Sequence, residues 1–177
     1  MDTAVGAISI WRDKLATMLS ACTYWQQFDG QAWTAAQALE RIYQDTSPLL
    51  DDLLQNPANR PYAIIHKGTS GLHWSGASAP RLYTVRGTLI IEFHRTPPTL
   101  KADDPGDSER EYENAIGRII ASYDANNPGL LELSALGDYL QITGLREDGP
   151  YRVDPTEVPM AGDVQVYFLE IDFGNGV

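Results

Sequence analysis

The sequence is poor in the residues that build disulfides and membrane spans. Cys22 is the only cysteine, so neither an internal disulfide nor a Cys-rich zinc site can form within the chain, and we expect a protein made in a reducing cytoplasm. No apolar run reaches the roughly 18 to 20 residues that a membrane helix needs, and the start Met-Asp-Thr-Ala lacks the basic residues of a signal peptide. We therefore expect no membrane association and no export.

Positive charge is also scarce. The 177 residues include 13 Lys and Arg against 24 Asp and Glu, a net charge of -11. Such an excess of carboxylates repels phosphate backbones and argues against direct nucleic-acid binding, although an acidic protein can line a path along which DNA slides. The length is that of one ordinary domain, which we predict to span residues 1–177.

No catalytic motif is complete. The run from Lys67 to Gly71 resembles a phosphate loop, but its Lys precedes the glycines and no helix pattern follows. Ser70 and Ser75 lack the Gly-x-Ser-x-Gly elbow of a nucleophile. Paired carboxylates such as Asp51-Asp52 are expected to be solvated or to cap helices. We accordingly predict no enzyme activity, no cofactor and no metal.

Three histidines leave one alternative open. His66, His73 and His94 all lie in or beside the first two predicted strands and become neighbours if those strands form a hairpin. Three imidazoles can hold zinc, which makes a small metal- or ligand-binding α+β enzyme the competing interpretation. Their spacing matches no His-x-His or His-Glu-x-x-His motif, so ordinary polar-face residues are favoured.

The stretch from Leu82 to Arg95 organises the rest of the chain. Its residues are mostly β-branched, aromatic or aliphatic, and Pro97-Pro98 follows shortly, so we predict one long strand. At period two, Leu89, Ile91 and Phe93 share an apolar face, while the other face is mainly polar except for Ile90. Gly87 predicts a bulge or a close backbone contact in mid-strand.

Apolar periodicity and turn residues place the other elements. The predicted fold class is α+β, with a mainly antiparallel sheet of about four strands and helices packed mostly on one face. An acidic loop arm is predicted over residues 96–111, and Glu147 to Pro150 reads as a turn. The predicted helices are 4–23, 34–44, 47–54 and 108–123, the last with a Ser108–Glu111 capping box, and the predicted strands are 62–66, 82–95, 139–145 and 163–173.

Aromatic residues near turns suggest a contact surface. Trp25, Trp33 and Trp74 flank predicted turns, where an aromatic often marks an interface, whereas Trp11 is explained by core packing. The connector from Tyr24 to Asp29 holds too many rings for a solvated loop, so some of these rings are expected in the core or in an interface.

The order of these elements resembles the tail-terminator, or tail-completion, proteins of long-tailed bacteriophages. The likeness lies in an amphipathic first helix, a hairpin with a long central strand, an extended acidic loop, the helix with Tyr112 and Tyr123, and a last strand ending Tyr-Phe-Leu-Glu-Ile-Asp-Phe-Gly. It covers nearly the whole chain and rests on layout, size and acidity, because no diagnostic motif is present. The stretch 34–54 and the loop 68–80 are longer than in the smallest members.

The resemblance implies a structural virion protein that is assembled in the host cytoplasm and located at the head-proximal end of the tail. It implies a homo-oligomeric ring, commonly a hexamer, that caps the tail tube protein, contacts the head–tail connector and lets DNA pass without specific binding. Asp103, Asp104 and Asp107 are then expected as loop contacts or lumen charges, and Trp25, Trp33 and Trp74 as interface anchors. A cytoplasmic tail-assembly chaperone or adaptor is the remaining alternative.

Overall fold

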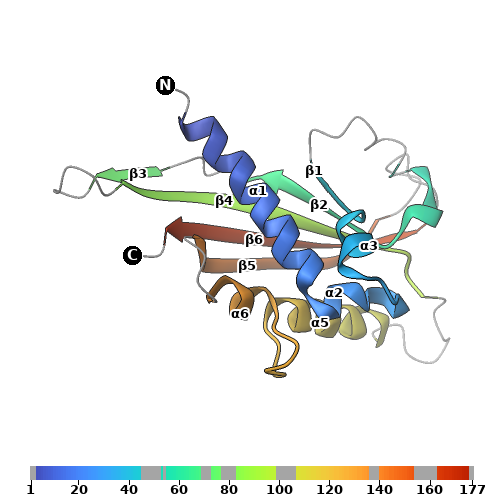
Figure 1. The fold of residues 1–177 in the computed structure, drawn as a ribbon. Coiled ribbons are helices and arrows are strands. Elements are labelled where there is room, and N and C mark those ends of the chain that lie inside the picture. Colours follow the sequence, from blue (N-terminus) through green and yellow to red (C-terminus); the bar gives the residue numbers. More distant parts are fainter. Residues whose placement is uncertain are drawn as a thin grey trace.

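The computed structural model describes residues 3–44, 53, 55–68, 73–76, 83–98, 107–135, 140–153 and 163–175. Within these residues six strands form a single sheet, and the helices lie across one of its faces (Figure 1). The strands are β1 (Ile42–Gln44), β2 (Tyr62–Lys67), β3 (His73–Gly76), β4 (Tyr83–Arg95), β5 (Leu140–Val153) and β6 (Val164–Asn175). Their order is β1-β2-β4-β6-β5, with β3 paired to β4 beside this path. The predicted α+β class is confirmed, and the sheet has more strands than predicted.

The predicted long strand is confirmed as β4, which pairs antiparallel with β2, β3 and β6. Its register with β6 runs through Gly87 without a shift, so no bulge forms there. The close backbone contact occurs one residue further on, where the amide of Gly68 donates to the carbonyl oxygen of Thr88 at 2.9 Å. A Cβ on Gly68 would lie 2.8 Å from that oxygen, so only glycine fits at this crossing.

The sheet is mixed because β1 runs parallel to β2. The sequence predicted a helix over 34–44, but α3 covers only Ala35–Leu39 and the chain then turns into β1. Thr34 does cap this helix through a capping box with Gln37. The helical pattern fails after Leu39 because the edge of β2 offers unpaired backbone groups, which the main chain of Ile42–Gln44 satisfies.

The remaining helices follow the apolar stripes of the sequence. The predicted helix 4–23 is confirmed with an earlier end, and the helix predicted over 108–123 ends at Ile120. The helix predicted over 47–54 lies outside the described residues except for Leu53, which is buried. The elements are α1 (Thr3–Ala21), α2 (Thr23–Gln26), the 3-10 turns η1 (Phe28–Gly30) and η2 (Pro57–Asn59), α5 (Asp107–Ile120) and α6 (Leu130–Ala135).

The start of α5 differs from the prediction. Helix α5 begins at Asp107, so the predicted loop arm 96–111 overlaps its first turn, and the part of the arm over 99–106 lies outside the described residues. The predicted capping box is wrong, because Ser108 is buried and its hydroxyl accepts from Nε2 of Gln165 at 3.1 Å. The serine therefore ties the helix to β6 instead of capping it.

Strand β5 is twice as long as the predicted strand 139–145. The turn predicted at Glu147–Pro150 lies inside it, because the extra residue is absorbed by a register shift against β6 between Asp148 and Tyr151. Gly149 adopts a φ of +117° at this bulge, a conformation that favours glycine. A second shift lies between Ile142 and Gly144.

The main core lies between the helices and the nearer face of the sheet. It joins the stripe of α1 (Trp11, Leu15, Leu19) and that of α5 (Tyr112, Ile116, Ile119) to the inward side chains of β4 and β6. The aromatic connector supplies Trp25 and Phe28, both buried here. The indole of Trp25 lies 5.7 Å from the ring of Phe93 and donates to the carbonyl oxygen of Ala38 at 3.2 Å.

Candidate functional site on the open sheet face

The second face of the sheet is covered at one end and open at the other. At the covered end Tyr62 and Ile64 of β2 are buried against Leu53. Toward β5, Ile90 and Phe168 are only half-buried, whereas their neighbours along each strand, which point to the other face, are buried. We call this exposed part, formed by the outward residues of β4, β5 and β6, the open face.

A carboxylate between two imidazoles lies at the border of the covered end. Glu92 accepts a hydrogen bond from Nε2 of His66 at one oxygen and from Nε2 of His94 at the other, both at 2.7 Å. The ring of His94 is fully buried and stacks on Tyr62 at 4.7 Å between centroids. The three residues come from β2 and β4, where His66 lies opposite Ile90 and Glu92 opposite Ile64.

The surroundings of Glu92 keep it ionised. Burial by itself would raise its pKa, but the hydrogen bonds from His66 and His94, together with the charges of these rings, outweigh burial and lower the pKa to about 2. Both Nε2 atoms therefore act as donors to a carboxylate. This arrangement orients the rings and fixes the register of β2 on β4, as cross-strand polar pairs do.

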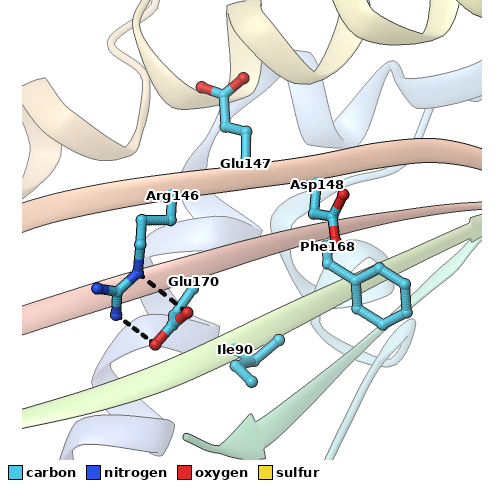
Figure 2. A pocket seen from close by; sticks show the side chains of 6 residues that line it. All are labelled: Ile90, Arg146, Glu147, Asp148, Phe168 and Glu170. Atoms are coloured by element: carbon cyan, nitrogen blue, oxygen red, sulfur yellow. Dashed lines mark hydrogen bonds and ion pairs between the residues drawn. The ribbon is translucent and has the colours of Figure 1, made fainter. Parts of the chain in front are cut away.

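A pocket of about 310 Å³ opens on the same face (Figure 2). One of its lining residues, Phe168, lies opposite Glu92 in the pairing of β4 with β6. Its floor is apolar and is made by Ile90 of β4 and Phe168 of β6. On β5 and β6 the pocket is bordered by Arg146, Asp148 and Glu170. Glu147 also borders it, but its carboxylate points to the helix side, where it accepts from the hydroxyl of Tyr167 at 2.6 Å.

The charged side chains around the pocket are unequally paired. Nε of Arg146 donates to Glu170 at 3.1 Å, Nη2 of Arg146 donates to the other oxygen of Glu170, and the guanidinium lies 3.6 Å from Asp172. The hydrogen bonds to Glu170 raise the pKa of Arg146 further. Asp148 accepts from the hydroxyl of Tyr151, and no cation pairs with it in the described part of the chain. One carboxylate at the rim is thus left without a counter-charge.

The two register shifts of β5 decide which side chains reach this pocket. Asp148 lies opposite Phe168 and Tyr151 lies opposite Val166, so both point to the open face although they are three residues apart. The ring of Tyr151 is 6.4 Å from that of Phe168 and extends the apolar floor. The shift after Ile142 similarly turns Arg146 outward while Ile142 packs against the core.

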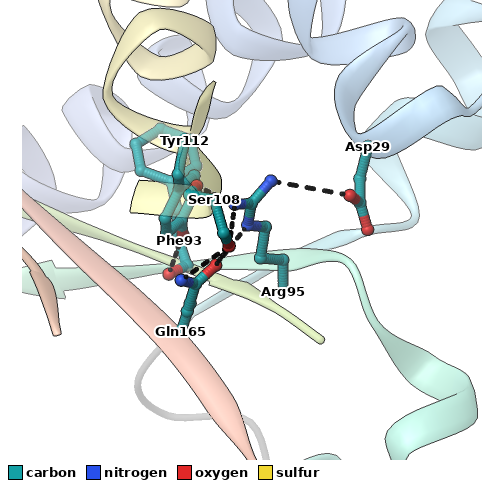
Figure 3. Close-up of polar contacts among 6 residues, drawn as sticks. All are labelled: Asp29, Phe93, Arg95, Ser108, Tyr112 and Gln165. Atoms are coloured by element: carbon teal, nitrogen blue, oxygen red, sulfur yellow. Dashed lines mark hydrogen bonds and ion pairs between the residues drawn. The ribbon is translucent and has the colours of Figure 1, made fainter. Parts of the chain in front are cut away.

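A buried arginine, Arg95, is the last residue of the long strand β4 (Figure 3). Nε of Arg95 donates to Oε1 of Gln165 at 2.7 Å, and Nη2 donates to the carbonyl oxygen of Ser108 at 2.6 Å. The guanidinium lies 4.4 Å from the centre of the Tyr112 ring and 3.8 Å from the carboxylate of Asp29. Burial raises the pKa of Asp29 and Arg95 opposes this rise. The cluster joins β4 to the start of α5, and so brings together both ends of the segment 96–107.

Among the predicted interface and lumen residues, the structure describes the side chains of Trp25 and Trp33, whose rings lie 5.7 Å apart. Trp25 is fully buried in the core of its own chain and has no surface for a second subunit, so its prediction as an interface anchor is wrong. Trp33 is half-buried, with the guanidinium of Arg41 5.8 Å from its ring, and stays a prediction. The side chains of Trp74 on β3 and of Asp107 at the start of α5 lie outside the described part, as do Asp103 and Asp104 altogether.

The structure brings two of the three histidines together and separates the third. His66 and His94 share Glu92, whereas His73 of β3 lies opposite Arg86. Since Arg86 is eight residues from His94 along β4, the distance is about 26 Å at 3.3 Å per residue. The three-histidine site of the competing interpretation is therefore not formed. Within the described ranges, no three His, Cys, Asp or Glu side chains are placed to hold a metal ion.

Sequence reasoning missed the pocket residues Arg146, Asp148, Phe168 and Glu170. The one available signal was Ile90, an apolar residue on the otherwise polar face of the long strand, which forms the pocket floor. The others depend on pairing across β5 and β6, which the period of a single strand does not show.

Comparisons with known proteins leave the site to be judged from its geometry. No protein-family model matches the chain, and the search of curated proteins found no match. No helix in the described ranges is long and apolar enough to cross a membrane.

Proposed function

We propose that the chain is a structural protein of a long-tailed bacteriophage, a tail terminator whose subunits form a ring that caps the tail tube and contacts the head connector. The observation that carries the proposal is the one-sided layering of the fold. Helices cover one face of a mixed sheet, while the open face and the edge strand β5 remain exposed. This layout agrees with the order of elements on which the resemblance rests.

A closed ring of identical subunits needs two different surfaces on each subunit, because head-to-tail contacts join unlike patches. The helix layer supplies one candidate. Ile10 of α1 is 55% exposed and Leu39 of α3 is 44% exposed, and these two helices contact each other. The other candidate is the edge of β5, which in the described part of the chain pairs only with β6. We assign the ring contact to these two surfaces.

The charge of the chain supports a channel for DNA. The net charge of -11 opposes the counterion release on which DNA binding depends. Helix α5 exposes Glu109, Glu111 and Glu113, and it follows directly on the acidic segment that contains Asp103 and Asp104. We assign the lumen to this side of the molecule, because like charges let DNA pass without being held.

Mass in solution tests the proposal. Light scattering over a range of protein concentrations, with and without tail-tube protein, is expected to show a shift from the monomer mass of 19.6 kDa to roughly six times that value. Leu39→Lys is expected to prevent the shift, because it places a charge in the assigned contact. Tyr123→Lys is the matched control, since Tyr123 is fully exposed on the turn after α5.

A monomer that ignores both concentration and tube protein would contradict the ring. The assembly chaperone or adaptor would then be the better interpretation, and its absence from purified virions would support it. If Leu39→Lys and Tyr123→Lys behave alike while the wild type assembles, the ring stands and the assignment of its surface is wrong.

A further inference from the structure

The pocket on the open face has the properties of a site for one protruding side chain. Its volume of about 310 Å³ is at the lower end of the range of ligand pockets. The floor of Ile90 and Phe168 is apolar, and Tyr151 extends it with a ring that is 47% exposed. Half-exposed apolar side chains at the centre of a polar rim are typical of the place where an interface anchor packs.

The charge of the pocket rim indicates the charge of a complementary partner. Two carboxylates, those of Asp148 and Glu170, border the floor, and the guanidinium of Arg146 pairs with Glu170 and with Asp172, which lies outside the pocket lining. Asp148 has only the Tyr151 hydroxyl as a partner in the described part of the chain. A cation placed beside the apolar anchor would complete this pairing, whereas a further carboxylate would be repelled.

This charge favours a different protein over a second copy of the chain. The chain carries 24 acidic residues against 13 basic ones, and its longest polar segment, 96–111, contains five carboxylates. Nucleic acid is disfavoured for the same reason, since phosphates would meet the acidic rim. The complementary occupant is a basic protein segment.

We propose that the open face of the sheet is a docking site for a basic segment of another protein, which inserts an aromatic or aliphatic side chain over Ile90 and Phe168 and places Lys or Arg beside Asp148. The site shares strand β5 with one of the two surfaces assigned to the ring contact, but it lies on the open face of the sheet and not along the hydrogen-bonding edge of that strand, and the inference holds for a ring or a monomer. Within a tail, it gives the ring a separate surface for a partner that is not another ring subunit.

Binding of short labelled peptides tests the site. The probe is Gly-Lys-Phe-Lys-Gly, followed by fluorescence anisotropy at 50 mM salt, with Gly-Glu-Phe-Glu-Gly as the charge control and Gly-Lys-Gly-Lys-Gly as the anchor control. We expect the first peptide to bind at least tenfold more tightly than either control, and to weaken as salt is raised.

Two charge reversals separate the pocket from the general acidity of the protein. Asp148→Lys is expected to raise the dissociation constant of the first peptide about tenfold. Glu113→Lys makes the same change of charge on the exposed side of α5 and is expected to leave binding unchanged. Asp148→Asn serves if the reversal does not fold, because its amide oxygen still accepts from Tyr151, and a threefold loss is expected.

The outcomes are distinct from those for the ring. Equal binding of the three peptides, or equal losses for Asp148→Lys and Glu113→Lys, would overturn the docking site. A change in the self-association mass of Asp148→Lys with peptide binding unchanged would also overturn it, since this part of β5 would then belong to the contact between copies of the chain. Peptide binding by a chain that stays monomeric leaves the docking site intact and removes only the proposed ring.

Discussion

The shared carboxylate of Glu92 makes the stability of the protein depend on pH in a predictable way. Folding lowers the pKa of Glu92 from 4.5 to about 2. A group whose pKa is lowered stabilises the folded state fully above its unfolded pKa, and this contribution is lost as the pH falls through the folded value. The relevant window is therefore pH 4.5 to 2. The lowered pKa corresponds to about 3 kcal/mol at neutral pH, at 1.36 kcal/mol for each pKa unit.

Glu92→Gln isolates this contribution, because an amide has the shape of the protonated carboxyl group and carries no charge. We expect the free energy of unfolding at pH 7 to fall by about 3 kcal/mol relative to the wild type. The difference should shrink below pH 4.5 and approach zero near pH 2. Urea unfolding followed by fluorescence of the buried indoles Trp11 and Trp25 measures it at each pH.

The control is Glu113→Gln on the exposed side of α5, which should change the free energy of unfolding by less than about 0.5 kcal/mol at any pH. A deficit in Glu92→Gln that stays constant from pH 7 to pH 3 would refute the reasoning. The loss would then come from altered packing around His94 and not from the missing charge.

Three further predictions concern buried groups. Arg95→Ala should lower the free energy of unfolding by about 3 kcal/mol in urea titrations, because it leaves Asp29 and the other partners of the buried guanidinium unpaired. A loss below about 1 kcal/mol would show that the cluster around Arg95 does not stabilise the fold. Gly68→Ala should cost about 2 kcal/mol and lower the thermal midpoint, since its Cβ meets Thr88, and an unchanged midpoint would show that the strands can separate there. Burial raises the pKa of the Cys22 thiol, so a thiol reagent at pH 8 should label it only after urea unfolds the chain; rapid labelling in native buffer would place it near the surface.

The sequence predicted the parts of the fold that depend on local periodicity. Helices α1 and α5 and strand β4 each have one apolar face, and burial of that face leaves little freedom in how these elements pack. The prediction failed at 34–44, where Ile42 and Tyr43 fit a helical stripe but pair with β2 instead. Local pattern cannot register the hydrogen bonds that a neighbouring strand edge offers.

The same limit explains the two clusters of charged residues. Arg95 and Ser108 are 13 residues apart and Gln165 is a further 57 away, so no spacing in the sequence links them. Similarly, Glu92 contacts His66 because β2 and β4 pair in one particular register. A shift of that register by one residue would turn His66 to the helix side of the sheet. The sequence shows that these residues are charged or polar, but it does not show which of them contact one another.

The pocket shows most clearly why strand alternation was insufficient. With strict alternation, Ile142 and Arg146 would share one face of β5, and Asp148 and Tyr151 would lie on opposite faces. Each register shift adds one residue and reverses this parity, so that Ile142 packs on the core while Arg146, Asp148 and Tyr151 all face outward. Gly149, which the sequence analysis placed in a turn, instead allows the second reversal through its positive φ. Asp148, which belongs to the segment interpreted as a turn, thus lies in a strand and borders the pocket.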